Sequence, residues 1–238
     1  MVTSWRRKGT KLSVLMMAAL CAGGITVAAD LDEVLKGFDE VQNSISTLSA
    51  AFTETTTNEL LIDPISAEGH FFMTKPDSIR WEYSFPEEMR FVIFQDQYTG
   101  YFPKQKRAEK RNIQRWSEHI FRFFGLGQGS QELMKFYNIS LDPAHDSSSG
   151  TYLLVLEPTK RRVRKRIPEV RFWLDVETYL PRRVEYRSKR GNARTVEFHE
   201  IRLNPDLAAS MYHVEIPADV KVSSGFSGLP SWQPDSTQ

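Results

Sequence analysis

Apolar and polar residues alternate with two different periods along the 238-residue chain. Between residues 31 and 48 the apolar residues recur every three or four positions, with Asp, Glu, Gln and Ser between them. This spacing gathers them on one stripe and predicts an amphipathic helix with one buried face. From residue 50 onward the period changes to two, which is typical of strands that bury one face of a sheet.

The segments of period two continue through the chain and predict a mainly β protein. They cover about residues 50–52, 67–73, 79–84, 89–93, 139–141, 152–156, 170–177, 184–187 and 195–201, with one or two more strands between 211 and 222. Pro64, Pro76, Pro86 and Pro103 separate the early segments, as in strands joined by short turns. We expect about nine to eleven mostly antiparallel strands in one sheet, which must curl.

The strand pattern breaks between Ser117 and Tyr137, where aromatic and aliphatic residues crowd around Gly125 and Gly127. We predict two short helices separated by a glycine hinge. The pattern allows two interpretations: the helices are ordinary core that plugs the curled sheet, or they form a detachable lid over an apolar cavity.

The first 29 residues have the layout of a secretory signal. Four basic residues precede an apolar run that starts at residue 12, and small residues end at Ala29, where a signal peptidase would cut. The run is too short and too interrupted by glycine to span a membrane. Cys21 suggests a lipid-anchored alternative, but Leu20 stands where the lipoprotein peptidase prefers a small residue. We therefore expect an exported, soluble protein that begins near Asp30.

Composition and charge narrow the function classes. Residues 1–29 hold four of the 31 Lys and Arg, none of the 30 Asp and Glu, and the only cysteine, so the remaining chain has a formal charge of −3. It therefore lacks a disulfide, a thiol nucleophile and a cysteine metal site. A length of about 210 residues suits a single domain. We assign this domain to residues 30–222 and a flexible tail, rich in Ser, Gly and Pro, to residues 223–238.

Motifs that would indicate catalysis do not appear. His70, His119, His145, His199 and His213 lack metal-ligand spacing. The chain contains no Gly-x-Ser-x-Gly elbow, P-loop or dinucleotide-binding glycine pattern. We therefore expect no catalytic residues, no metal and no cofactor, and we do not expect an enzyme.

Residues 160–194 are unusually basic, with 13 basic and four acidic residues. Such a run is usually a solvated face. It could also attract an anionic lipid surface, lipopolysaccharide or an acidic patch on a partner protein. Nucleic acid is not an expected partner of an exported chain with a negative net charge.

Several short motifs resemble the LolA family, the periplasmic carriers of outer-membrane lipoproteins. Residues 48–54 resemble the family's Ala-x-Phe-x-Gln strand, and residues 69–81 resemble Gly-x-aromatic-x-x-x-Arg-Pro followed by Trp. The resemblance continues at Asp96, at the Tyr-x-Pro of residues 101–103 and in the closing segment 212–222. It covers residues 31–222 in order, although residues 104–180 match in pattern only.

The resemblance implies a half-open antiparallel β barrel closed by a helical lid, with an apolar interior that accepts acyl chains. It also implies a carrier that takes lipoproteins from an inner-membrane ABC transporter and delivers them to an outer-membrane acceptor. We expect a monomer. The predicted lipid-binding cavity consists of Phe52, Phe71, Met73, Trp81, Phe91, Ile93 and, in the lid, Phe121 and Phe124. Ile79 is the predicted contact with a partner. Two alternatives are a carrier of another envelope lipid or glycolipid, and a lipid-sensing regulatory domain.

Three positions depart from the family pattern. Lys75 stands where the family has an arginine that hydrogen-bonds the carbonyls of the lid. Lysine lacks the planar fork of arginine, so we expect it either to bind one carbonyl as a weaker latch or to be a solvated loop residue. Glu54 replaces the usual Gln, and Gln97 replaces the usual Gly.

Overall fold

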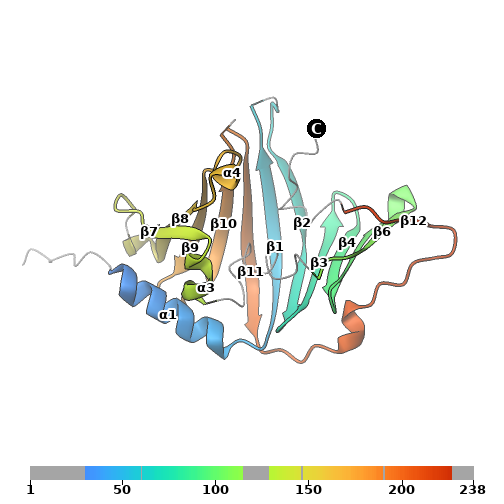
Figure 1. The fold of residues 1–238 in the computed structure, drawn as a ribbon, viewed down its shortest axis with the longest axis horizontal. Coiled ribbons are helices and arrows are strands. Elements are labelled where there is room, and N and C mark those ends of the chain that lie inside the picture. Colours follow the sequence, from blue (N-terminus) through green and yellow to red (C-terminus); the bar gives the residue numbers. More distant parts are fainter. Residues whose placement is uncertain (1–29, 60, 115–128, 146, 190, 227–238) are drawn as a thin grey trace, which may run out of the picture.

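One curled sheet of twelve strands forms the body of the molecule (Figure 1). The computed structural model describes residues 30–59, 61–114, 129–145, 147–189 and 191–226. In chain order the strands are β1 (Thr47–Thr57), β2 (Ile65–Thr74), β3 (Ser78–Phe85), β4 (Met89–Phe94), β5 (Gln97–Phe102), β6 (Arg107–Asn112), β7 (Tyr137–Leu141), β8 (Thr151–Pro158), β9 (Glu169–Asp175), β10 (Pro181–Arg187), β11 (Ala193–Leu203) and β12 (Lys221–Ser223).

The sheet is open, because its two edge strands are not paired with each other. Its order is β12-β6-β5-β4-β3-β2-β1-β11-β10-β9-β8-β7, and every pairing is antiparallel except that of β12 with β6. The curled, half-open antiparallel sheet that the sequence predicted is therefore confirmed. The structure has twelve strands, whereas nine to eleven were predicted, and β6 is one that the pattern missed.

The predicted amphipathic helix is present as α1 (Leu31–Ser44). It begins at Asp30, whose carboxylate accepts a hydrogen bond from the Asp32 backbone N–H at 3.3 Å, as N-terminal caps do. Its buried stripe includes Val34, Leu35 and Phe38. The helix ends four residues before the predicted end, because the chain becomes extended at residue 45 and Leu48 already belongs to β1.

The other helices in the described residues are short. They are α3 (Ser130–Met134) and α4 (Arg161–Arg164), with 3₁₀ turns at Pro103–Gln105, Ser147–Ser149 and Ala209–Tyr212. The predicted helix pair of residues 117–137 falls largely on residues 115–128, which lie outside the described part of the chain. Within the described residues, α3 occupies the end of that segment. No helix in the described part is long and apolar enough to cross a membrane.

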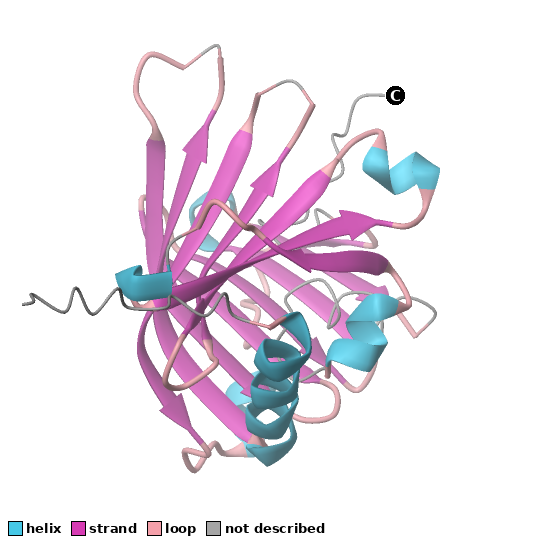
Figure 2. Ribbon diagram, turned by 90° about the vertical axis from the view of Figure 1, so that its left-hand side faces the viewer, coloured by secondary structure: helices cyan, strands magenta, loops and turns pink. Residues whose placement is uncertain are grey.

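The strands run up and down, so their connections gather at two ends of the sheet. We call one the helix end: it carries the turns β2–β3 and β9–β10 and the junction of α1 with β1. We call the other the hairpin end: it carries the connections β1–β2, β3–β4, β8–β9 and β10–β11. In Figure 2 the sheet curls around the side on which α1, the longest helix, lies.

The inner face of the sheet and the stripe of α1 share one core. Buried residues of α1 pack in the same cluster as alternate residues of β1–β5 and β8–β11. Gly37 allows α1 to approach the β9–β10 turn closely, because a Cβ atom at this position would lie only 2.5 Å from the ring of Tyr179.

The first residues of the predicted tail contact the sheet. Ser223, the first residue of the predicted tail, is still part of β12. Phe226 packs against Tyr98 of β5, with ring centroids 4.6 Å apart. Contacts with the sheet therefore continue to Phe226, and residues 227–238 lie outside the described part.

Candidate functional site

The interior under α1 brings together the six predicted cavity residues that the structure describes. They come from the inner faces of β1–β4, and each is at most 2% exposed: Phe52, Phe71, Met73, Trp81, Phe91 and Ile93. Period-two alternation explains the arrangement, because every second residue of a strand points to the same face. Phe121 and Phe124, the predicted lid residues, lie outside the described part of the chain.

Trp81 is the centre of this interior. Its indole ring lies 4.8 Å from the ring of Phe52 and 4.9 Å from that of Phe71, measured between centroids. The two pairs are tilted or edge-to-face, which are favourable geometries for aromatic rings. In this conformation the side chains pack on one another beneath α1.

The opposite wall of the interior was missing from the predicted cavity. Phe198 of β11 lies 6.2 Å from the Trp81 ring, and Phe172 of β9 and Val184 of β10 belong to the same buried cluster. The sequence did carry the signal for this wall, since the strands at 170–177 and 184–187 have the same alternation as those at 67–93. The antiparallel return of β8–β11 beside β1 places them on the same face.

Ile79 is inside rather than on the surface. It is 1% exposed and belongs to the core cluster. In the conformation described, its side chain is not accessible to a partner protein, so the predicted contact would require this residue to become exposed.

Lys75 connects the sheet to the last turn of α1. From the β2–β3 turn its ammonium donates a hydrogen bond to the backbone carbonyl of Gln42 at 2.5 Å. Its backbone N–H also donates to the carbonyl of Ser46 at 2.9 Å. The last turn of α1 has no basic residue of its own. The Gln42 carbonyl also accepts a hydrogen bond from the Ile45 backbone N–H at 3.4 Å. The ammonium at this position therefore adds a second donor to that carbonyl and a charge that favours the negative end of the helix dipole. Burial lowers the pKa of the Lys75 ammonium.

Asn204 forms a second connection at the same place. Its side-chain carbonyl accepts hydrogen bonds from the backbone N–H groups of Ser46 (2.7 Å) and Thr47 (3.3 Å), while its amide donates to the carbonyl of Ser44 at 3.1 Å. Its φ of 53° lies in the left-handed region, which asparagine tolerates better than most residues. The alternation of apolar residues did not indicate this position, although the Asn-Pro dipeptide that it begins is a turn signal.

A polar contact also joins α1 to α3. The carboxylate of Asp39 accepts hydrogen bonds from the Ser130 backbone N–H at 2.5 Å and from its hydroxyl at 2.6 Å. Between the two helices lies a surface pocket of about 280 Å³ whose lining includes Asp32, Asp39 and Glu40. It is too polar to be an acyl-chain site.

Toward the hairpin end the interior becomes polar. Glu54 is 5% exposed, and its carboxylate accepts a hydrogen bond from the Tyr83 hydroxyl at 2.7 Å and pairs with Arg194 at 3.2 Å. Burial, and then the charge of Glu54, raise the pKa of Tyr83 well above its ordinary value. Burial likewise raises the pKa of Tyr186. The family departure at Glu54 thus places a buried ion pair where an amide would be neutral.

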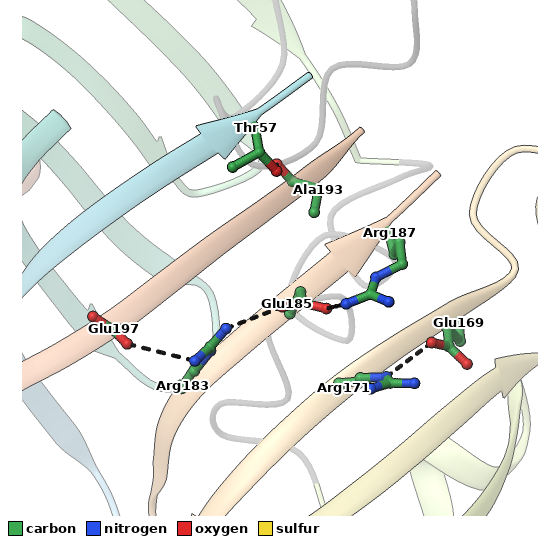
Figure 3. Close-up of polar contacts among 8 residues, drawn as sticks. All are labelled: Thr57, Glu169, Arg171, Arg183, Glu185, Arg187, Ala193 and Glu197. Atoms are coloured by element: carbon green, nitrogen blue, oxygen red, sulfur yellow. Dashed lines mark hydrogen bonds and ion pairs between the residues drawn. The ribbon is translucent and has the colours of Figure 1, made fainter. Parts of the chain in front are cut away.

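The outer face of β9 and β10 carries a separate network of charges (Figure 3). Glu185 lies between Arg183 at 3.1 Å and Arg187 at 2.6 Å, and Arg171 pairs with Glu169 at 2.8 Å. The Arg183 guanidinium also stacks over the Trp173 ring at 4.5 Å. This part of the basic stretch is therefore engaged in contacts within the molecule.

An open, curled antiparallel sheet with an aromatic inner face and a helix across it defines the class of half-open β barrels. Residues 43–215 match the sequence model of the family described as outer membrane lipoprotein carrier protein LolA. The chain belongs to the LolA family. No curated protein sequence matches it.

Several solved structures are similar to this chain at low sequence identity. An uncharacterized conserved protein from Thermus thermophilus is 11% identical, with a TM-score of 0.52 over 81% of this chain and 97% of that one. A LolA superfamily protein from Nitrosomonas europaea is 11% identical, with a TM-score of 0.42 over 79% and 99%. The lipoprotein LppX from Mycobacterium tuberculosis is 10% identical, with a TM-score of 0.46 over 75% and 99%.

Proposed function

We propose that the protein is a periplasmic carrier that binds the acyl chains of lipoproteins between the curled sheet and α1 and moves them from the inner to the outer membrane. The observation that carries this proposal is the continuous aromatic interior around Trp81, covered by a helix whose last turn is joined to the sheet through a few hydrogen bonds. Membership of the LolA family supports the same function.

The energetics of an acyl chain require an interior of this kind. A chain of about fifteen methylenes gains roughly 12 kcal/mol on leaving water, at about 0.8 kcal/mol per methylene. A carrier must offer comparable apolar burial, or its cargo remains in the membrane. The inner faces of β1–β4 and of β8–β11 provide two apolar walls, and Met73 adds a side chain that adapts to chains of different shape.

Because this interior is filled by its own side chains, cargo entry requires α1 to move away from the sheet. Lys75 and Asn204 hold the last turn of α1 and the residues that follow it, so we assign them the role of a latch. Four residues at and after the end of α1 take part in these bonds, namely Gln42, Ser44, Ser46 and Thr47. Each such bond contributes only about 1 kcal/mol net, so a cargo that binds more tightly can displace them.

Export through the signal at residues 1–29 would bring the protein to the periplasm. There we expect it to act as a monomer, receive cargo from an inner-membrane ABC transporter and pass it to an outer-membrane acceptor.

Transfer of a fluorescent triacylated lipopeptide between donor and acceptor vesicles tests the proposal. We expect the purified protein to accelerate transfer, and native mass spectrometry to find one acylated molecule per protein. Lys75→Leu should bind cargo but release it more slowly, Lys75→Arg should restore or tighten closure, and Lys110→Leu on the outer face is the matched control. A protein that neither binds nor transfers any acylated probe would refute the proposal. A glycolipid recovered from the envelope protein would instead identify another cargo, and lipid binding without transfer would favour a sensor.

A further inference from the structure

Exposed apolar side chains concentrate at the hairpin end. In the described part of the chain eight large apolar residues are exposed, and five of them lie at this end: Leu61, Ile62, Ile65, Phe85 and Val163. Scattered apolar residues are normal on a protein surface, but a concentration at one end indicates a contact surface.

The β1–β2 connection gives the clearest case. Ile62 at its tip is 98% exposed, and Leu61 beside it is exposed as well. Neither side chain belongs to the core cluster of the domain. The loop also contains the acidic residues Glu59 and Asp63. It therefore supplies apolar side chains but no positive charge.

The β8–β9 connection supplies the positive charge. Its residues 160–166, here called the basic segment, contain six basic residues and Val163, and no acidic residue stands between Glu157 and Glu169. All seven are exposed. The six basic side chains form no ion pair with any residue that the structure describes. In this they differ from Arg171, Arg183 and Arg187 on the neighbouring strands, which are paired with glutamates.

The topology places the two connections on the same side. The strand pairs β1–β2, β8–β9 and β10–β11 are antiparallel, and β11 is also antiparallel to β1. Their connecting turns therefore all lie at the hairpin end of the sheet. Figure 1 shows the β1–β2 tip and α4, which lies in the basic segment, at the end opposite α1.

We infer that the hairpin end docks on the surface of a bilayer that contains anionic phospholipids. The basic segment would lie over the anionic headgroups, and Ile62 and Val163 would enter the boundary between headgroups and acyl chains. Apolar insertion combined with electrostatic attraction is the pair of forces that holds peripheral proteins on membranes. This inference goes beyond the proposed carriage of cargo and does not depend on occupation of the interior. A docked molecule would hold α1 away from the membrane.

Co-sedimentation of the lipid-free protein with vesicles tests the inference. We expect binding to vesicles with about one third phosphatidylglycerol, little binding to pure phosphatidylcholine vesicles, and release as NaCl rises from roughly 0.1 to 0.5 M, because salt screens the charges. The triple variant Arg161→Gln, Arg164→Gln, Lys165→Gln should bind on the order of 100-fold more weakly, at roughly fivefold per charge. Ile62→Asn should bind roughly tenfold more weakly, since it removes the inserted side chain.

Matched controls distinguish docking through the hairpin end from effects of net charge and of exposed apolar side chains elsewhere on the surface. Lys36→Gln, Lys110→Gln and Arg202→Gln together remove the same charge elsewhere, and Leu203→Asn removes an exposed apolar residue at the helix end. Both controls should bind vesicles like the parent protein. Equal binding to neutral and anionic vesicles, equal loss in the controls, or no vesicle binding while the basic segment binds an acidic protein would overturn the inference. Cargo variants such as Lys75→Leu should leave vesicle binding unchanged, so failure here is distinct from failure of the proposed carriage.

Discussion

The two ends of the curled sheet differ in how far their apolar side chains are shielded from water. At the helix end, α1 covers the interior with Val34, Leu35 and Phe38, and its last turn is held by Lys75 and Asn204. At the hairpin end no comparable helix covers the described strands, the interior carries the Glu54–Arg194 ion pair, and apolar residues such as Ile62 are exposed.

This difference indicates that the ends have different tasks. Apolar packing with a few polar bonds makes a closure that is stable yet reversible, which suits a gate. Exposed apolar side chains and basic side chains without an ion pair contribute little to folding and suit a contact with another surface. Substitutions at the helix end should therefore change stability and opening, whereas those on the rim of the hairpin end should change binding alone.

The largest expected effect concerns the packing of α1. Phe38→Ala removes a ring that is 1% exposed and should lower the free energy of unfolding by about 3–5 kcal/mol, as for other buried phenylalanines. Ile62→Ala, at the exposed tip of the other end, should change it by less than about 0.5 kcal/mol. Urea denaturation followed by tryptophan fluorescence measures both. Equal losses in the two variants would show that the ends do not differ in this way.

Alkaline pH should destabilise the protein through its buried tyrosines. Burial raises the pKa of Tyr137 to about 12 and, together with the charge of Glu54, raises that of Tyr83 well above its ordinary value. An unfolded tyrosine ionises near pH 10, so above that pH these residues keep their protons only while the protein is folded. Their contribution is fully present below pH 10 and is lost as pH rises above it, by about 1.4 kcal/mol per residue at pH 11.

Lys75 should make the folded state more stable, rather than less, as pH rises. Its pKa is lowered by burial, so the folded state releases this proton before the unfolded state does, and the cost of burying its charge disappears as pH rises through its lowered pKa. Urea denaturation at pH 8, 10 and 11 should nevertheless show a net loss, since several tyrosines outweigh one lysine. Tyr83→Phe should flatten the pH dependence, and an unchanged slope in that variant would contradict the assignment.

The sequence predicted the fold through its apolar alternation, and it failed where that signal was absent. β6 consists mainly of charged residues, and Glu109 faces inward beside Tyr98 instead of an apolar residue. No period-two apolar pattern could therefore indicate the strand. The end of α1 was predicted too late because the apolar signal continued beyond the helix. Ile45 and Leu48 are buried like the residues of the helix stripe, but their backbone is extended.

The candidate site was half predictable. The family motifs pointed to the wall formed by β1–β4 and to Lys75 as a latch to the lid. The lid residues lie outside the described part, and the Lys75 ammonium instead bonds the Gln42 carbonyl of α1. The wall formed by β8–β11 needed knowledge of which strands are neighbours, since β11 pairs with β1 across more than a hundred residues. The role of Asn204 could not be predicted either, because its hydrogen-bond partners lie about 160 residues earlier in the sequence.

The polar interior of the hairpin end should tolerate an amide better than an apolar residue. Glu54→Leu removes the acceptor of Tyr83 and the partner of Arg194, and should cost about 1–3 kcal/mol of unfolding free energy, the penalty for leaving buried polar groups without partners. Glu54→Gln keeps the shape and one acceptor, so its cost should be smaller. Glu197→Leu, on the half-exposed outer face, is the control and should be nearly neutral. If Glu54→Leu is also neutral, the ion pair is not a structural feature of this end.

The smallest expected change in stability is the most informative about the gate. Asn204→Ala and Lys75→Leu each remove hydrogen bonds to the last turn of α1 or the residues after it, and should lower the global free energy of unfolding by only about 1 kcal/mol. Both should nevertheless speed hydrogen exchange of the α1 backbone amides by about fivefold, because local opening no longer breaks these bonds. The amides of β1 and β11 should be unaffected. Lys36→Leu, on the exposed side of α1, is the matched control and should leave exchange unchanged. If α1 exchanges at the parent rate in both latch variants, its position is fixed by apolar packing alone, and Lys75 and Asn204 do not control its opening.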